Sequence, residues 1–108
     1  IEEKERLARV HVDKAEQLKN AGNEKLKGGD LSGARVLYSE AIATDPVNPI
    51  PYANRAQVLL KLGEPAGAIQ DCDAAIERDP RYVKAYMRRA AARTMLGGGG
   101  GGGVGQPE

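Results

Sequence analysis

The sequence is poor in the residues that build β-rich cores, metal sites and disulfide frameworks. Of its 108 residues none is Trp or Phe, four are Tyr, one is Cys and one is His. A core without Trp or Phe rests mainly on aliphatic side chains and Ala, which suits helix packing better than a β-sandwich. One cysteine cannot form an internal disulfide, and one histidine without other cysteines makes no metal cluster. We therefore expect an all-α chain that needs no metal and no cofactor.

Excess charge and long apolar runs are lacking too. Lys and Arg number 16 against 15 Asp and Glu, so the net charge of +1 is far from the basic excess typical of nucleic-acid binding. No run of about 20 apolar residues is present, which argues against a membrane-spanning helix. Together with the lone cysteine, these absences predict a cytoplasmic protein that binds neither nucleic acid nor membrane.

What the sequence does contain is an internal repeat. Gly29, Gly63 and Gly97 are separated by 34 residues each. Further matches at this offset are Ala34 with Ala68, Ala41 with Ala75, Ile42 with Ile76, and Asp45-Pro46 with Asp79-Pro80. Repeats of this length that carry helical apolar patterns stack into solenoids of helix pairs.

Each repeat is predicted to form two helices joined by a glycine turn. The first helix should begin at Asp13, an N-cap with Glu16 as its capping-box partner, and end at Gly28-Gly29. The second should run from about Leu31 to Asp45-Pro46, because proline removes a backbone donor and restricts the residue before it.

The second repeat and a third inner helix follow the same pattern. We expect helices over residues 50–62, from Pro65 to Asp79-Pro80, and over residues 81–96. Ala and Gly at the crossing positions allow close antiparallel packing. The first helix of each pair should then line the concave side of a superhelix, and the last of them should have one face uncovered.

The repeated positions resemble the tetratricopeptide repeat (TPR). In the first repeat they are Leu18, Gly22, Gly29, Ala34, Tyr38, Ala41 and Pro46. In the second they are Tyr52, Ala56, Gly63, Ala68, Cys72, Ala75 and Pro80. The resemblance implies an all-α TPR superhelix of antiparallel helix pairs, here two full repeats plus helix A of a third.

The ends differ in composition from the repeats between them. We place the TPR domain at residues 13–96, after a charged N-terminal extension over residues 1–12. We expect this extension to be helical, either as a backward continuation of the first helix or as a short separate helix. Seven glycines, Gly97 to Gly103, should form a flexible loop, because ordering glycine costs the most entropy. Gln106-Pro107 resembles the opening of the helix at Pro65 and is expected to start a truncated next helix; the alternative is a low-complexity tail.

Five polar residues on the inner helices form the candidate binding site. Lys19 and Asn23 are four residues apart and so share one helix face, and Lys84 and Arg88 repeat that spacing. Asn54 lies on the inner helix between them. Lys and Arg donate charge-assisted hydrogen bonds, and Asn amides add donors without adding charge. Such a set suits two carboxylates held close together, as at a chain end with a terminal Asp.

These five residues resemble the dicarboxylate clamp of TPR domains from chaperone-binding co-chaperones. The resemblance implies that the groove binds the Glu-Glu-Val-Asp tail of the seventy- and ninety-kilodalton heat-shock chaperones. Asn is frequent at the positions of Asn23 and Asn54 for structural reasons, so the three cations carry most of the specificity. The pair Arg88-Arg89 also resembles TPR modules of specialised assembly co-chaperones.

Two other functions are compatible with the repeat. A TPR scaffold could bind a helix or an internal segment of a partner, with no requirement for a free carboxylate. An enzyme could carry its catalytic domain outside these residues. Within the chain no nucleophile lies beside a base, and the glycine run lacks the Lys and Ser or Thr of a phosphate-binding loop, so we expect no catalysis here.

The remaining conspicuous side chains are expected to be structural. Cys72 takes the place of Tyr38 in the second repeat, so a packed thiol is expected there. Tyr52 and Tyr86 occupy helix-packing positions. Solvent-facing positions are expected for His11, Asp71 and Asp73.

Overall fold

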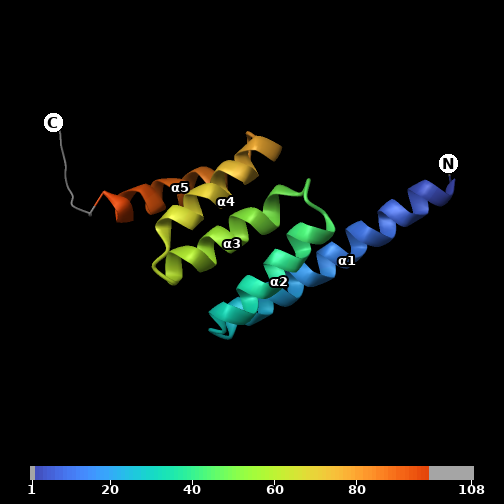
Figure 1. Ribbon diagram of the computed structural model, residues 1–108, viewed down its shortest axis with the longest axis horizontal. Coiled ribbons are helices and arrows are strands. Elements are labelled where there is room, and N and C mark those ends of the chain that lie inside the picture. Colours follow the sequence, from blue (N-terminus) through green and yellow to red (C-terminus); the bar gives the residue numbers. More distant parts are fainter. Residues whose placement is uncertain (1, 98–108) are drawn as a thin grey trace.

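The computed structural model describes residues 2–97, and within them it is built of five helices (Figure 1). Their bounds are α1 Glu2–Lys27, α2 Leu31–Thr44, α3 Pro49–Lys61, α4 Pro65–Arg78 and α5 Val83–Leu96. α1 packs on α2 and α3 packs on α4, while α5 contacts both α4 and α3. The all-α prediction of two helix pairs and one further helix is confirmed. The expected helix start at Gln106-Pro107 lies outside the described residues.

The turns follow from the residues at the helix ends. Gly29 and Gly63 adopt φ values of 84° and 76°, a left-handed conformation that only glycine reaches without strain, and each joins the two helices of a pair. Asp30 caps α2, since its Oδ1 accepts a hydrogen bond of 2.9 Å from the Gly33 amide. Pro49 and Pro65 open α3 and α4, where a missing amide hydrogen costs nothing.

The start of the first helix was predicted wrongly. α1 begins at Glu2 and continues through Asp13 and Glu16, so these two residues form no capping box. Three acids in the first turn interact favourably with the positive end of the helix dipole, and no proline interrupts the segment. Figure 1 shows this part of α1 projecting beyond α2. The helical extension expected before residue 13 is thus the first part of one long helix.

Small residues make the close helix crossings. The fully buried residues include Ala34, Ala41, Ala53, Ala56, Ala68, Ala75, Ala85 and Ala92. Tyr38 and Cys72 occupy equivalent positions and are both completely buried, as expected for Cys72. Gly22 lies against the Tyr38 ring: a Cβ on Gly22 would be 2.6 Å from Tyr38 Cε1. The first helix pair therefore accommodates a large ring because its partner residue has no side chain.

The outer face of α5 is open within residues 2–97. Val83, Met87 and Leu96 are largely exposed. Tyr86 was expected in the core but is 39% exposed, because no described helix covers α5 on this side. Its hydroxyl still donates a hydrogen bond of 2.7 Å to the Pro80 carbonyl, as that of Tyr52 does to Pro46 at 2.9 Å.

Candidate carboxylate-binding site

Hydrogen bonds connect three of the five predicted site residues across α1, α3 and α5. Arg88 Nη1 donates to the Ala53 carbonyl at 2.9 Å and to Asn54 Oδ1 at 3.4 Å. Asn54 Nδ2 in turn donates to Asn23 Oδ1 at 3.3 Å. The Tyr38 hydroxyl donates to the same Asn23 oxygen at 2.5 Å. The structure therefore brings Asn23, Asn54 and Arg88 together in one network, to which Tyr38 is an addition that the sequence did not indicate.

The direction of these bonds decides which groups remain for a ligand. Both amide oxygens, of Asn23 and Asn54, accept hydrogen bonds from protein donors. Within residues 2–97 no protein acceptor is assigned to Asn23 Nδ2 or Arg88 Nη2. These two groups are donors, and a carboxylate needs donors.

The two lysines lie one helical turn before Asn23 and Arg88. Lys19 is mostly buried, and its Nζ is 3.1 Å from Glu16 Oε2 on the same helix. Lys84 is exposed on α5, four residues before Arg88, so the two share a helix face. Lys19 thus has an internal counter-ion, which an arriving carboxylate would have to displace.

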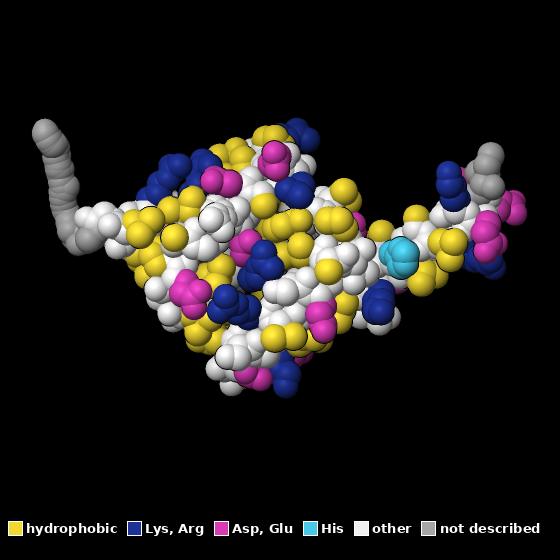
Figure 2. All heavy atoms as spheres, in the orientation of Figure 1, with side chains coloured by type: hydrophobic (Ala, Val, Ile, Leu, Met, Phe, Trp, Pro, Cys, Tyr) yellow, Lys and Arg dark blue, Asp and Glu magenta, His cyan; other side chains and the backbone are white. Residues whose placement is uncertain are grey.

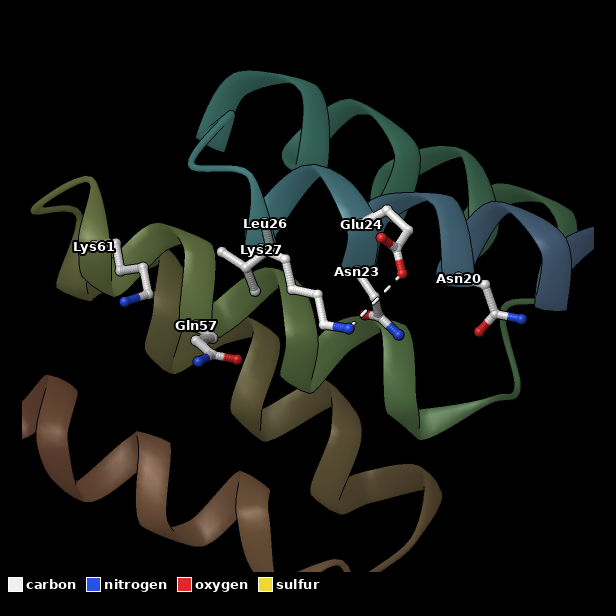
Figure 3. Close-up of a pocket in the computed structure, with 7 residues that line it drawn as sticks. All are labelled: Asn20, Asn23, Glu24, Leu26, Lys27, Gln57 and Lys61. Carbon is white, nitrogen blue, oxygen red and sulfur yellow. Dashed lines mark ion pairs between the residues drawn. The ribbon is translucent and has the colours of Figure 1, made fainter.

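A pocket adjoins the network at Asn23. It has a volume of about 590 Å³ and lies between α1 and α3. The lining residues, drawn in Figure 3, are Asn20, Asn23, Glu24, Leu26, Lys27, Gln57 and Lys61. Lys27 pairs with Glu24 at 3.9 Å, while Leu26 is the single apolar lining residue. This pocket was not predicted from the sequence, although its α1 residues lie within one helical turn of Asn23.

Burial and the Arg88 charge set the protonation of the neighbouring core groups. Burial raises the pKa of the Tyr38 hydroxyl, and the nearby Arg88 opposes this rise. Burial, with a smaller effect of Asp71, raises the pKa of the Cys72 thiol to about 11. Both groups are therefore neutral at pH 7: Tyr38 stays a hydrogen-bond donor, and Cys72 is not a nucleophilic thiolate.

The expectation that Asp71 faces solvent was wrong. Asp71 is 6% exposed, and its two carboxylate oxygens accept hydrogen bonds of 2.7 Å from Arg55 Nε and Nη2. Arg55 also donates to Ser39 Oγ at 3.0 Å. Arg55 directly follows Asn54, so this ion pair joins α4 to the helix segment that carries a site residue. The partners lie 16 residues apart on different helices, so no local pattern indicated the pair.

Asp73 is exposed, as expected, and makes a weaker version of this contact. Its Oδ1 is 2.8 Å from Arg89 Nη1, and Arg89 directly follows Arg88. In the view of Figure 2, cationic and acidic side chains are interspersed over the surface. No helix of residues 2–97 is both long and apolar enough to cross a membrane. Nor does that range bring three His, Cys, Asp or Glu side chains together to hold a metal ion.

Comparisons with known proteins identify the family. A family described as "TPR repeat" matches residues 22–63, and one described as "Tetratricopeptide repeat" matches residues 49–82. The solved second TPR of Spaghetti (RPAP3), bound to the HSP90 peptide SRMEEVD, is 38% identical, with a TM-score of 0.80 over 84% of this chain and 84% of that chain. The chain belongs to the tetratricopeptide-repeat family.

Other relatives share the same region. The second TPR domain of human RPAP3, solved in complex with the HSP70 peptide SGPTIEEVD, is 36% identical, with a TM-score of 0.75, over 84% of this chain and 73% of that one. The heat shock protein sti1 homolog of Schizosaccharomyces pombe is 44% identical over 85% of this chain. Human serine/threonine-protein phosphatase 5 is 40% identical over 80% of this chain. The chain spans 16% and 17% of the lengths of these last two proteins.

Proposed function

We propose that the groove formed by α1, α3 and α5 binds the C-terminal Glu-Glu-Val-Asp tail of heat-shock chaperones, of the seventy- or ninety-kilodalton class. The chain, with residues 13–96 as its binding domain, then serves as a co-chaperone adaptor and not as an enzyme. The network of Asn23, Asn54 and Arg88 is the observation that carries this proposal, because it leaves donors and not acceptors for a ligand. The relatives solved with HSP90 and HSP70 peptides that end in EEVD support it.

Each of the five residues has a role in this proposal. Arg88 and Lys84 on α5 and Lys19 on α1 supply positive charge from opposite sides of the groove. The amides of Asn23 and Asn54 lie between them and add neutral donors. A terminal Asp carries two carboxylates a few bonds apart, so donors from several helices can bind it at once.

The surroundings of the groove fit an acidic, unstructured ligand. Lys27 and Lys61 lie in the pocket beside Asn23 and can meet acidic residues upstream of the chain end. The charge balance of the whole chain gives no reason to add nucleic acid to the partners. We place the interaction in the cytoplasm, in keeping with the single reduced cysteine.

The test is a calorimetric titration of the chain with the peptide SRMEEVD and with the same peptide carrying a C-terminal amide. For the free acid we expect a Kd on the order of micromolar, and for the amide an affinity at least about tenfold lower, because one anionic acceptor is lost. A peptide with the same composition in scrambled order controls for nonspecific charge. Equal affinity for acid and amide would reject the carboxylate site and favour a scaffold that binds an internal segment.

A further inference from the structure

The Tyr38 hydroxyl lies at the inner end of the network, where packing alone would not require a polar group. Cys72 fills the equivalent position of the second repeat without a hydroxyl, and it is equally buried. The Tyr38 ring reaches Asn23 because Gly22, the preceding residue on α1, leaves room for it. The only hydrogen bond that the hydroxyl makes within residues 2–97 is the one to Asn23 Oδ1.

We propose that Tyr38 is a positioning residue of the carboxylate site, whose hydroxyl holds the Asn23 side chain so that Nδ2 faces the groove. The proposal rests on the function proposed above. It assigns to Tyr38 no contact with the ligand: Tyr38 acts through Asn23.

Arg88 fixes the direction of the hydrogen bonds in the network. A guanidinium has donors only, so the amide oxygen of Asn54 must face Arg88. Asn54 Nδ2 then faces Asn23, whose oxygen must accept from it. A flipped Asn23 would set two NH₂ groups against each other and turn its oxygen toward the ligand's carboxylates.

The Asn54 bond alone is a weak restraint on Asn23, since at 3.3 Å it lies beyond the usual range for such bonds. Tyr38 supplies the short bond of 2.5 Å to the same oxygen. A phenol can donate or accept, but beside an oxygen that already faces Asn54 it acts as donor. Burial raises the pKa of Tyr38, so the hydroxyl keeps its proton at pH 7, where the ligand's carboxylates are anionic.

The experiment compares Tyr38→Phe with Tyr52→Phe, using the acid and amide forms of SRMEEVD. Tyr38→Phe keeps the ring against Gly22 and removes only the hydroxyl. Tyr52→Phe is the matched control, since it removes a hydroxyl that is bonded to the Pro46 carbonyl and not to a site residue. We expect Tyr38→Phe to lower the acid-to-amide affinity ratio about threefold to tenfold, because a freed Asn23 loses its fixed donor, and Tyr52→Phe to leave the ratio unchanged.

A second readout is the Asn23 side-chain NH₂ signal in the NMR spectrum of the free protein. It should shift or broaden in Tyr38→Phe and stay in place in Tyr52→Phe. If the wild-type chain discriminates acid from amide and Tyr38→Phe keeps the same ratio, Tyr38 positions nothing. If the wild-type chain does not discriminate, the proposed function fails, and an unchanged NH₂ signal would then overturn the positioning role as well.

Discussion

The two complete repeats, α1–α2 and α3–α4, use the same packing but different polar contacts. Ala34 and Ala68 are equally buried, and the glycine turns have nearly the same φ. The first pair contains Tyr38 bonded to Asn23, where the second has the thiol of Cys72. The second pair contains the Arg55–Asp71 ion pair, where the first has Ala21 and Leu37.

This difference separates the positions that set the helix packing from the positions that set the polar contacts. The positions that match at the 34-residue offset let the helices pack closely and turn, and both repeats have the same residue types there. Positions that break the offset carry the hydrogen bonds around Asn23 and Asn54. Exchanging residues between the repeats therefore tests the comparison directly.

The largest expected effect is on the ion pair of the second repeat. Asp71→Ala leaves Arg55 mostly buried without its partner and should lower the free energy of unfolding by about 3–5 kcal/mol in urea denaturation. Asp73→Ala removes a carboxylate that is 55% exposed and should cost at most about 1 kcal/mol. The double variant Arg55→Ala/Asp71→Leu introduces the residue types that the first repeat has at Ala21 and Leu37. It should recover most of the lost free energy of unfolding. Equal losses in Asp71→Ala and Asp73→Ala would show that the burial of the carboxylate does not set the stability contribution of the ion pair.

The next effect concerns the ring that only the first repeat holds. Gly22→Ala places a Cβ against Tyr38 and should destabilise the chain by about 1–3 kcal/mol in the same assay. Gly22→Ala/Tyr38→Cys creates the Ala and Cys combination of Ala56 and Cys72 and should be more stable than Gly22→Ala alone. If Gly22→Ala/Tyr38→Cys is less stable than Gly22→Ala, the two repeats do not share their packing as described.

The thiol of the second repeat should make stability depend on pH. Burial raises the pKa of the Cys72 thiol from 9.0 to about 11. The protonated thiol therefore contributes its full stabilisation below about pH 9, and this contribution is lost as the pH rises toward 11. Relative to Cys72→Ala, the wild-type chain should lose about 1–2 kcal/mol over that range. Chemical denaturation at several pH values measures this difference. Parallel curves for the two proteins would contradict the buried neutral thiol.

The smallest effect is expected at Glu16, the internal counter-ion of Lys19. Glu16→Gln removes a competitor for the ligand's carboxylate and should raise the affinity for SRMEEVD about twofold, the scale of one exposed helical ion pair. The control is Glu3→Gln, which removes the acidic partner of Arg6 from an exposed pair of the same spacing in the first turn of α1 and should leave the affinity unchanged. A weaker affinity in Glu16→Gln would mean that Glu16 orients Lys19 rather than neutralising it.

Most of the fold could be predicted from the repeat. Glycine and proline mark helix ends in a local, sequence-visible way, so the starts of α3 and α5 were placed within two residues of Pro49 and Val83. The start of α1 was misplaced because Asp13 can cap a helix as well as continue one. Whether Asp13 caps or continues a helix depends on the residues before it. There the acidic residues Glu2, Glu3 and Glu5 favour a helix N-terminus at the start of the chain.

The site could be predicted only as a set of residues. The 34-residue register places Asn54 and Arg88 at equivalent positions, and the structure joins them. The contributions of Tyr38 and Arg55 depend on contacts between residues of different helices, which lie 15 and 16 positions apart in the chain. Such contacts follow from distances between side chains, which a repeat pattern does not contain.

The most direct measurement is a double-mutant cycle between Arg88 and the terminal carboxylate. Wild-type chain and Arg88→Ala are each titrated with SRMEEVD as free acid and as C-terminal amide. We expect a coupling energy of about 1.5–3 kcal/mol, the strength of a hydrogen bond to a charged group, so that Arg88→Ala scarcely distinguishes the two peptides. A coupling energy near zero, with both proteins distinguishing the peptides equally, would contradict a carboxylate site at Arg88.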